Sequence, residues 1–492
     1  MTDNGRSRMA GPAAGPLVVS ATNPRYFAAR GNAVYLTGSH IWNNFHDGMG
    51  PGADCAEVPE RMDFDDYLTF LEEHGHNFIR LWRWEQFRSQ AAGGAFHLCM
   101  SPQPWPRSGP GEASDGKPRF DLSQCDEAFF DRLRERVVAA GARGIYVAVM
   151  LFEGWGLHLS PPPDNVGGHP FFGGNNVNDV TISSIDDYQV LPLDPQVLEL
   201  QQAYLRRVVD TVQDQPNVLY EVANESSGGG VIPRDFAEAM GFADTPAWGD
   251  STPWQHWVID FVRRYEDEKG YVKRPIGMTM QYPVSDQGKV NDVLWDGPAD
   301  WVSPGFDDVP HPGDPANPSR WYADPPANDG RKVSISDTDH YAPGQGDALW
   351  AWKSFVRGHH PILMDFGLIA GVTPDAPGYQ AFETGRHAMG DTARFANRTN
   401  LTTIEPHGEL SSTGYLLASP GEEYLALQPS ETGEPCTVTL VPGTYAVEWF
   451  SVNARETVVA SDVEASGTES FTAPFQPAGP AVVYLRRINK VR

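Results

Sequence analysis

Short apolar runs alternate with longer amphipathic stretches along most of this chain. The short runs place β-branched and aromatic residues at consecutive positions, as parallel strands covered on both faces do. They predict eight strands, at residues 33–38, 77–82, 145–151, 217–223, 275–280, 299–303, 332–336 and 361–365. Between many of them, apolar residues return every three or four positions, which predicts helices.

The predicted helices carry start and stop signals. Asp63 precedes one such stretch as an N-cap, and Gly75 ends it. Further helices are predicted at residues 129–141, 195–213, 254–262, 347–357 and 381–395. Eight strand–helix units in one run predict a (β/α)8 barrel, an architecture whose chemistry lies at the carboxyl ends of the strands.

Two long segments interrupt this pattern after the second and third predicted strands. Residues 93–117 and 160–190 are rich in proline, glycine and asparagine. Loops of this length are uncommon unless they serve a function or are disordered. Because both follow strands, they belong to the active face of the barrel, and we expect them to cap its mouth.

The pattern changes beyond Asn400. Short strands separated by proline and glycine turns are predicted at residues 414–418, 424–428, 436–440, 445–450, 471–473 and 481–486. This spacing is typical of a β-sandwich. We therefore divide the chain into a barrel of residues 1–400 and an accessory sandwich of residues 401–492. Since the sandwich shows no cluster of exposed aromatic residues, we expect it to stabilise the barrel.

Charge and hydropathy exclude several classes of partner. The formal net charge of -27 argues against nucleic acid and anionic membranes, because both are polyanions that require basic patches. No apolar run reaches the length of a membrane span. Residues 1–15 lack the apolar core of a signal peptide, which favours a soluble, cytoplasmic protein.

Cysteine and histidine spacing predicts no metal, no cofactor and no disulfide framework. The cysteines are scattered, without the paired spacing of a zinc site: Cys55, Cys99, Cys125 and Cys436. Four histidines that lie near strands also lack ligand spacing: His40, His158, His359 and His360.

Candidate chemistry gathers at the end of the fourth predicted strand, where Asn224 and Glu225 precede a glycine run. Cleavage of a glycosidic bond needs one carboxylic acid to protonate the leaving oxygen. It also needs a second carboxylate to meet the oxocarbenium-like carbon. Glu225 and Asp337, which follows the seventh strand, would supply this pair across the mouth of the barrel.

Five short motifs, spread over nearly the whole chain, resemble a known group of enzymes. They are YLTGSHIW at 35–42, NFIRLW at 77–82, VANE at 222–225, PGTY at 442–445 and FTAPF at 471–475. The chain resembles the clan A glycoside hydrolases, and more closely the apiosidase-like barrels that carry a small C-terminal sandwich.

The resemblance implies roles for three residues. Glu225 takes the place of the acid/base, Asn224 that of the hydrogen bond to the sugar 2-hydroxyl, and Arg80 that of the support of the nucleophile. The family has glutamate at the end of the seventh strand, where this chain has Asp337. Asp339, on the same face of an extended strand, is the alternative nucleophile. We favour Asp337 because it follows the apolar run directly.

The shorter aspartate side chain leaves three outcomes open: a retaining enzyme with an adjusted barrel, an inverting enzyme, or a site that has lost catalysis. Retaining chemistry places the two carboxyl groups about 5–5.5 Å apart, so the lost methylene matters. Asp365, at the end of the eighth strand, is a third carboxylate at the same mouth, and we expect it to orient the substrate.

Aromatic side chains complete the candidates for sugar binding. The chain has 14 Trp and 17 Tyr, and aromatic faces stack against the apolar faces of sugar rings. Four tryptophans lie at strand exits, where stacking and core packing both explain them: Trp42, Trp82, Trp84 and Trp155. His340 and Tyr341, beside Asp337, either bond sugar hydroxyls or pack structurally.

The sequence therefore predicts a glycoside hydrolase that acts on a short oligosaccharide or glycoside, with Glu225 as acid/base and Asp337 as nucleophile of a retaining mechanism. Two alternatives stay open. One is a non-catalytic carbohydrate-binding protein on a degenerate barrel, and the other is a transglycosidase that uses the same covalent intermediate.

Overall fold

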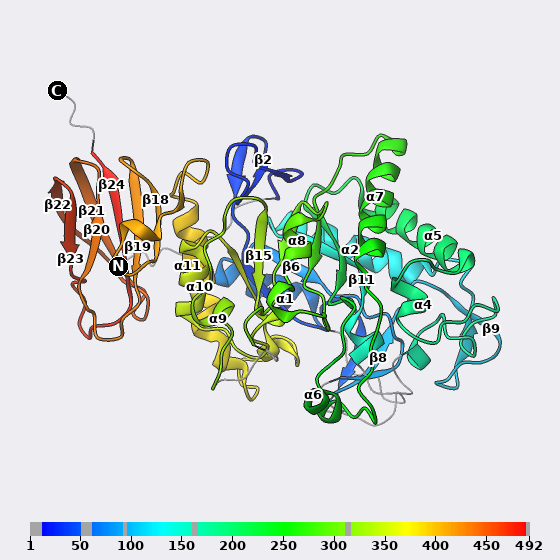
Figure 1. Ribbon diagram of the computed structural model, residues 1–492. Helices are drawn as coiled ribbons and strands as arrows, with labels where there is room; N and C mark the ends of the chain where they lie inside the picture. Colours follow the sequence, from blue (N-terminus) through cyan, green and yellow to red (C-terminus); the bar gives the residue numbers. More distant parts are fainter. Residues whose placement is uncertain (1–11, 51–61, 92–95, 160–165, 310–315, 489–492) are drawn as a thin grey trace.

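A parallel barrel of eight strands forms the centre of the protein (Figure 1). The computed structural model describes residues 12–50, 62–91, 96–159, 166–309 and 316–488. In spatial order, the barrel strands are β4 (Gly38–His40), β16 (His360–Met364), β15 (Val333–Asp337), β14 (Trp301–Ser303), β13 (Ile276–Thr279), β12 (Val218–Asn224), β11 (Tyr146–Glu153) and β6 (Phe78–Leu81). The predicted (β/α)8 barrel is confirmed.

The first two strands of the barrel close the ring. The backbone N–H of Asn77 donates to the carbonyl of Thr37 at 2.9 Å, and the Asn77 side chain accepts the Thr37 N–H at 2.8 Å. A Cβ at Gly38 would lie 2.2 Å from the carbonyl oxygen of Phe78. Only glycine permits this approach, so β4 and β6 can meet at this point.

The helices that surround the barrel match the predicted amphipathic stretches. They are α1 (Phe64–His74), α2 (Glu127–Ala142), α5 (Pro195–Val212), α7 (Thr252–Lys269), α10 (Ala348–Val356) and α11 (Glu383–Ala396). Asp63 caps α1 by accepting the N–H groups of Asp65 and Asp66, and Gly75 ends it in the left-handed conformation, as predicted. In the described parts of the fifth and sixth units, the α-helices are short: α8 (Asp292–Asp296) and α9 (Arg320–Ala323).

The beginning of the barrel differs from the prediction. Residues 33–38 do not form its first strand, because Asn32–Val34 (β3) pairs antiparallel with Phe27–Ala29 (β2), which pairs with Val18–Val19 (β1). Arg30 and Gly31 adopt positive φ angles of 49° and 82° and so make the tight turn of this hairpin. Phe27 packs with residues that begin the barrel strands, which closes the amino-terminal end of the barrel (Figure 1).

The two insertions are folded and joined to each other. At the first, β8 (Phe96–Ser101) pairs with β5 (Asp47–Gly50) on one side and with β7 (Ser89–Ala91) on the other, and β9 (Arg107–Glu112) forms a hairpin with β10 (Pro118–Phe120). The second follows α3 (Trp155–Leu159) and contains α4 (Asp186–Gln189). The backbone and side chain of Asn175 accept hydrogen bonds from Phe120 and Ser114, at 2.8 and 2.9 Å, respectively. The two segments were predicted as long loops, and their described parts contain strands and helices that the sequence pattern did not indicate.

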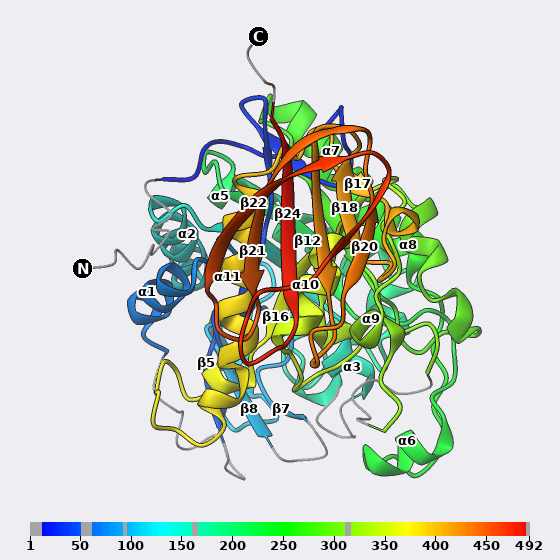
Figure 2. The same ribbon diagram turned by 90° about the vertical axis from the view of Figure 1, so that its left-hand side faces the viewer.

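Beyond the barrel, the chain forms an antiparallel sheet of six strands (Figure 2). Its strands, in spatial order, are β17 (Glu405–Pro406), β18 (Leu416–Ser419), β19 (Glu423–Gln428), β24 (Ala481–Arg487), β21 (Gly443–Ser451) and β22 (Thr457–Ala465). One face packs on a separate pair of strands, β20 (Cys436–Thr439) and β23 (Thr468–Phe471). The other face packs on α10 and α11. The predicted C-terminal sandwich is confirmed, although β22 was not predicted.

Alternation along the strands assigns the side chains to these two faces. Leu416 and Tyr424 belong to the core shared with β20 and β23. Leu417 and Leu425, one position further along, pack in the core that contains Trp352 of α10 and Phe395 of α11. Because successive side chains of a strand point to opposite faces, one face of the sheet packs on the barrel helices and extends their hydrophobic core.

Two further findings concern membrane-spanning helices and the cysteines. Within the described residues, no helix is both long enough and apolar enough to span a bilayer. Cys99 is disulfide-bonded, whereas Cys125 and Cys436 are free, and Cys55 lies outside the described residues. The sequence, which predicts no disulfide framework, gives no sign of this bond, because spacing along the chain does not show which cysteines the fold brings together.

Candidate active site

Carboxylates from two strands meet at the carboxyl-terminal end of the barrel. Asn224 is the last residue of β12 and precedes Glu225, while Asp337 is the last residue of β15 and precedes the short helix that carries Asp339. Arg80 projects from β6 among them. Since carboxyl ends of parallel strands share one rim, the fold brings these residues together as predicted.

Glu225 lies in a strained turn that both neighbouring strands support. Its φ angle is +43°, a value that residues other than glycine rarely adopt. Its N–H donates to Thr279 Oγ1 at 3.2 Å, and the N–H of Gly154 donates to the carbonyl of Asn224 at 2.8 Å. A Cβ at Gly154 would lie 2.7 Å from the Cα of Ser226, so the turn also needs this glycine. Strain held this firmly is typical of functional sites.

Arg80 is the buried cation of the site. Its guanidinium donates to both oxygens of Glu221, at 2.6 and 2.9 Å, and to Asn224 Oδ1 at 2.6 Å. Its Nη1 donates to Asp337 at 2.8 Å and to Asp339 at 3.1 Å. The planar fork of arginine therefore holds five oxygens of four side chains, from β12, from β15 and from the short helix after β15.

Asp337 is the more enclosed of the two aspartates. It is fully buried. Its Oδ2 bonds His40 Nε2 and Arg80 Nη1, each at 2.8 Å, and its Oδ1 accepts the N–H of Asp339 at 3.0 Å. Burial alone would raise the pKa of Asp337, but His40 and Arg80 outweigh it and hold the pKa below its ordinary value. Asp337 is therefore ionised at neutral pH.

Asp339 faces Glu225. Carboxylate oxygens of the two residues and a ring nitrogen of His340 all lie within 4.8 Å of one another. Burial raises the pKa of Glu225 well above its usual range, and the nearby charge of Asp339 raises it further. Burial also raises the pKa of Asp339, to about 6. At neutral pH this pair therefore carries a proton on Glu225 and a charge on Asp339.

His340 is neutral and holds Asn224. Its Nδ1 lies 2.8 Å from Ser303 Oγ, and its Nε2 lies 3.3 Å from Asn224 Oδ1. Burial lowers the pKa of His340 to about 3, and the Arg80 charge contributes to this shift. Since Asn224 Oδ1 accepts hydrogen bonds from a ring nitrogen and a guanidinium, its amide group can only be a donor toward a ligand.

The four predicted tryptophans form one contiguous aromatic group. Trp42 lies with its ring centroid 6.4 Å from that of Trp82 and 5.9 Å from that of Trp84, which in turn lies 6.4 Å from Trp155. Trp82 and Trp84 are buried, and Trp82 stacks on His40 at 6.0 Å. Trp42 and Trp155 are half-buried. Trp42 and Trp155 are therefore the two of the four that have exposed ring surface, and the buried rings of Trp82 and Trp84 pack beside them.

Two predicted site residues are engaged elsewhere. The Tyr341 hydroxyl bonds Ser336 Oγ and Trp350 Nε1, at 3.1 and 2.8 Å, and is fully buried. Asp365 forms a buried two-point ion pair with Arg386 of α11, at 2.7 and 2.8 Å. Both side chains thus support the strand ends on which the site is built.

Sequence reasoning missed three buried residues of the site. His40 bonds Asp337, Glu221 bonds Arg80, and Glu153 ends β11 beside Glu225. Burial raises the pKa of Glu153 well above its usual range. The sequence contains a signal for Glu221. It lies four positions before Glu225, and because side chains alternate with a period of two along a strand, both are expected on the same face. His40 has no metal-ligand spacing, and its partner Asp337 lies far away in the sequence.

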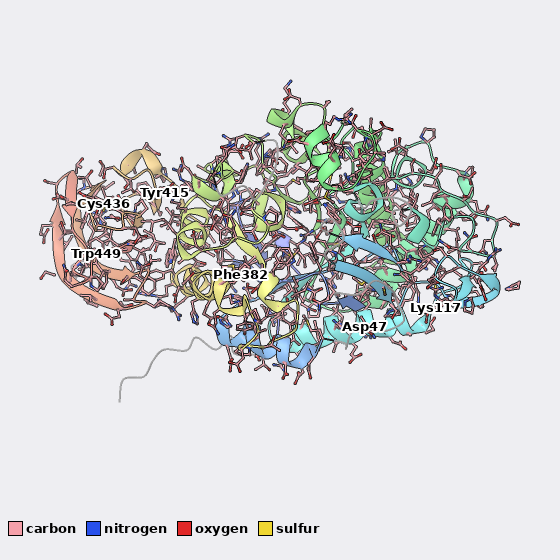
Figure 3. All side chains as sticks on the ribbon, turned by 90° about the horizontal axis from the view of Figure 1, so that it is seen from below. Asp47, Lys117, Phe382, Tyr415, Cys436 and Trp449 are labelled. Carbon is pink, nitrogen blue, oxygen red and sulfur yellow. The ribbon has the colours of Figure 1, made fainter. Side chains whose placement is uncertain are left out.

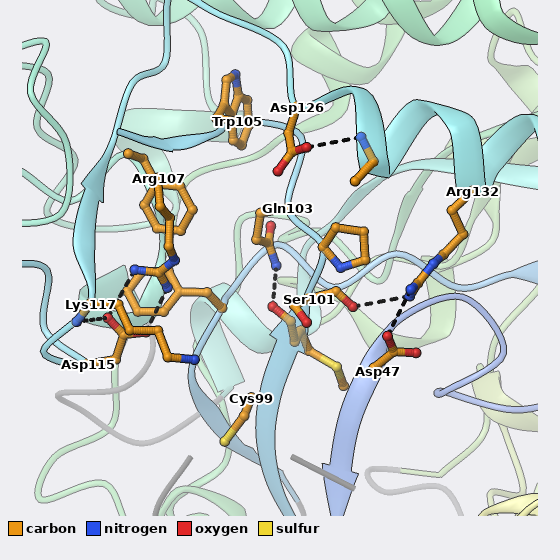
Figure 4. A pocket seen from close by; sticks show the side chains of 15 residues that line it. Asp47, Cys99, Ser101, Gln103, Trp105, Arg107, Asp115, Lys117, Asp126 and Arg132 are labelled. Carbon is orange, nitrogen blue, oxygen red and sulfur yellow. Dashed lines mark hydrogen bonds and ion pairs between the residues drawn. The ribbon is translucent and has the colours of Figure 1, made fainter. Parts of the chain in front are cut away.

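A separate cavity of about 300 Å³ lies between the first insertion and the beginning of α2 (Figure 4). Asp47, Gln103, Arg107 and Arg132 are among its lining residues. Arg132 pairs with Asp47 at 2.8 Å, and Arg107 pairs with Asp115 at 2.7 Å. Figure 3 shows Asp47 and Lys117, which also line it, far from Cys436 and Trp449 of the C-terminal strands. None of the predicted site residues lines this cavity.

Comparisons with known proteins support the fold. No protein-family model matches the chain, and no curated protein matches it in sequence. Among solved structures, it is similar to one described as a glycoside hydrolase, with 12% identity and a TM-score of 0.57 over 96% of this chain and 97% of the other. It is also similar to a glycoside hydrolase family 5 protein from Bacteroides vulgatus ATCC 8482, with 12% identity and a TM-score of 0.58 over 97% and 95% of the two chains. At this identity, the likeness concerns the fold.

Proposed function

We propose that this protein is a retaining glycoside hydrolase, with Glu225 as the general acid/base and Asp339 as the nucleophile. The observation that carries the proposal is the approach of the Glu225 and Asp339 carboxylate oxygens to within 4.8 Å at the mouth of the barrel. Retaining glycosidases hold their two carboxyl groups about 5–5.5 Å apart, whereas inverting enzymes need a wider gap for water.

The different protonation states of the two carboxyl groups at neutral pH suit these two roles. Glu225, protonated at neutral pH, gives its proton to the glycosidic oxygen while the bond from that oxygen to the anomeric carbon breaks. Asp339, ionised, attacks the anomeric carbon and forms a glycosyl ester. A water molecule then gives a proton to Glu225 and attacks the same carbon, which releases the sugar and restores Asp339.

Access distinguishes Asp339 from Asp337, the residue that the sequence favours as nucleophile. The Asp339 side chain is 8% exposed and receives one hydrogen bond, from Arg80. Asp337 is fully buried and receives three. We assign Asp337 the role of positioning Arg80, which in turn orients the charge of Asp339. Its role as nucleophile stays the alternative that the experiments below distinguish.

Sugar binding is assigned to the groups around this pair. The amide group of Asn224, which also hydrogen-bonds the Glu153 side chain, is proposed to bond a sugar hydroxyl, while half-buried Trp42 and Trp155 offer ring faces. The two joined insertions follow β6 and β11 and restrict the site to short glycosides. The resemblance to apiosidase-like barrels suggests that furanosides belong among the substrates.

The experiment that tests this function has two stages. Purified protein is first assayed with a panel of 4-nitrophenyl glycosides that includes pyranosides and furanosides of both anomers. The 2-deoxy-2-fluoro analogue of the sugar that is cleaved, with an activated leaving group, should then trap the glycosyl ester. Tandem mass spectrometry of the labelled peptide should locate the sugar on Asp339.

Other outcomes favour the alternatives. A label on Asp337 would support the assignment favoured by the sequence. Transfer of the sugar to an added alcohol in preference to water would indicate a transglycosidase. Saturable binding of a sugar that the protein never cleaves would indicate a carbohydrate-binding protein.

The disulfide at Cys99 also bears on localisation. Disulfides persist in oxidising compartments and are rare in the cytosol. We therefore propose that the protein works outside the cytosol, contrary to the expectation from residues 1–15. Blocking free thiols in intact cells before lysis should leave Cys99 unlabelled in the parent organism.

A further inference from the structure

A second group of potential ligands lies on the outside of the barrel, where its first and last helices meet. His74 ends α1, while Glu383 and His387 lie one turn apart at the beginning of α11. One ligand atom from each residue lies within 4.8 Å of the other two. We propose that these three side chains bind a zinc ion.

The distances suit a common ion. His74 Nε2 and His387 Nε2 each lie 3.1 Å from the same oxygen of Glu383, Oε1. Zinc binds histidine nitrogen and carboxylate oxygen at about 2.0–2.2 Å, and tetrahedral ligands at that distance lie roughly 3.4 Å apart. Each histidine nitrogen is therefore within a few tenths of an ångström of the spacing from Glu383 Oε1 that a shared ion needs, and all three ligand atoms lie within 4.8 Å of one another.

A hydrogen bond at Nδ1 of His74 leaves its other ring nitrogen, Nε2, available to bind the ion. Its Nδ1 lies 2.8 Å from the carbonyl oxygen of Phe70, which has no proton to give. Nδ1 is therefore the donor, and a neutral ring then has a lone pair on Nε2, aimed at Glu383. Two lone pairs at 3.1 Å require a second ring proton or a cation between them. A backbone carbonyl behind a ligating histidine is the usual support in metal sites.

Backbone packing fixes the two helices at this point. A Cβ at Gly390 of α11 would lie 1.9 Å from the carbonyl oxygen of His74, so the helices touch through glycine. The ring centroids of His74 and His387 are 5.0 Å apart. Arg386, whose charge would oppose a cation, bonds Glu383 Oε2 at 3.1 Å, but its main partner is Asp365, through two bonds of 2.7 and 2.8 Å.

The donor set and the exposure indicate the kind of ion. Two imidazole nitrogens and one carboxylate favour zinc, whereas calcium and magnesium prefer oxygen ligands alone. The side chains of His74, Glu383 and His387 are 9, 31 and 34% exposed, so the ion can enter from solvent and complete its shell with water. Bound there, zinc would tie the first helix of the barrel to the last.

The test is isothermal titration calorimetry of the intact chain with zinc chloride, after treatment with a chelator. We expect one zinc ion per chain, a higher Tm with zinc, and a visible absorption band when cobalt(II) replaces it. H74Q and H387Q should each weaken zinc binding by roughly tenfold or more and abolish the gain in Tm. Because His387 is partly exposed, H387Q should fold normally.

Two control variants locate the ion. H407Q removes a similar surface histidine, which pairs with Glu409 at 2.8 Å but belongs to no three-ligand group among the described residues, and it should bind zinc like the parent. E225Q removes a member of the Glu225, Asp339 and His340 group and should also bind zinc like the parent. The proposal is overturned if the chain takes up no zinc, if H387Q binds it normally, or if E225Q loses it.

Discussion

Glu225 and Asp339 bring carboxylate oxygens within 4.8 Å of each other from the ends of two different strands. A different structural feature positions each carboxylate. A left-handed turn after β12 aims Glu225, and a hydrogen bond from Arg80 at 3.1 Å holds Asp339. The first three predictions follow from this pair.

E225Q should distinguish substrates by their leaving group. Glutamine keeps the shape of the side chain but cannot give a proton, and proton transfer by a positioned group contributes about 10²–10⁴-fold. A natural glycoside, with a poor leaving group, should therefore lose activity on that scale. Glycosylation by a 2,4-dinitrophenyl glycoside, which needs no acid, should change little. Equal losses on both substrates in stopped-flow assays would exclude Glu225 as the acid.

Asp339→Ala and Asp337→Ala form a matched pair that identifies the nucleophile. Removal of the nucleophile should abolish cleavage of activated and natural substrates alike, and the cavity should admit azide. Azide should restore activity in Asp339→Ala and yield a glycosyl azide of inverted anomeric configuration, which NMR detects. Asp337→Ala should show a smaller loss without rescue. Rescue in Asp337→Ala alone would return the role to the residue that the sequence favours.

The pH profile of kcat/KM should be bell-shaped. The nucleophile must be ionised, so activity should fall as the pH drops through the pKa of Asp339, about 6. The acid must be protonated, so activity should fall as the pH rises through the raised pKa of Glu225. The two limbs belong to the coupled pair. In E225Q, the alkaline limb should vanish on an activated substrate, and its persistence there would contradict this assignment.

The two insertions should make cleavage exo-acting or specific for short oligosaccharides. They are bonded together through Asn175, and both leave the barrel on its active face. On a polysaccharide, reducing ends should therefore appear without an early fall in viscosity. Rapid loss of viscosity ahead of sugar release would mean that long chains pass through the site.

The C-terminal sheet should stabilise the barrel without contributing to catalysis. Phe450 is fully buried, with its ring 5.6 Å from Trp352 and 5.5 Å from Phe395. Phe450→Ala should lower the free energy of unfolding by about 3–5 kcal/mol, measured by urea denaturation, and leave kcat/KM unchanged. Val459→Ala, at a site that is 77% exposed, is the control and should change it by less than about 0.5 kcal/mol.

Removal of the sheet is a stronger test of the same idea. A chain ending near Asn400 should be insoluble or unstable, because the apolar surfaces of α10 and α11 would face water. A soluble truncated barrel with the Tm of the parent but much weaker substrate binding would show that the sheet serves the substrate.

Periodicity was sufficient for most of the barrel but not for its beginning. The helix α1 was predicted through Asp63 and Gly75, because capping is local chemistry. Residues 33–38 are as apolar as a barrel strand, yet Phe27 pairs with Val34 across the Arg30–Gly31 turn. Pairing between segments decides such cases, and a pattern within one segment does not contain it.

Most residues of the candidate site were predicted from the sequence, but not which of them contact one another. Strand ends indicated Glu225, Asp337 and Asp339, since a barrel gathers its strand ends at one rim. Which aspartate faces Glu225 depends on the turn after β15, where the backbone N–H of Asp339 donates a hydrogen bond to the Asp337 side chain. His40 could not be ranked from the sequence, because its partner belongs to the seventh strand.

The bond between His40 and Asp337 also has a consequence for how the protein is made. His40 belongs to the first barrel strand to leave the ribosome and Asp337 to the seventh, and they are 297 positions apart. Contacts of such separation form late, after much of the chain has been ordered. A nascent chain that lacks β15 therefore holds Arg80 and His40 without their aspartate, and glycosidase activity would first appear when synthesis has passed the seventh strand. Onset of activity during timed translation would then report closure of the barrel itself.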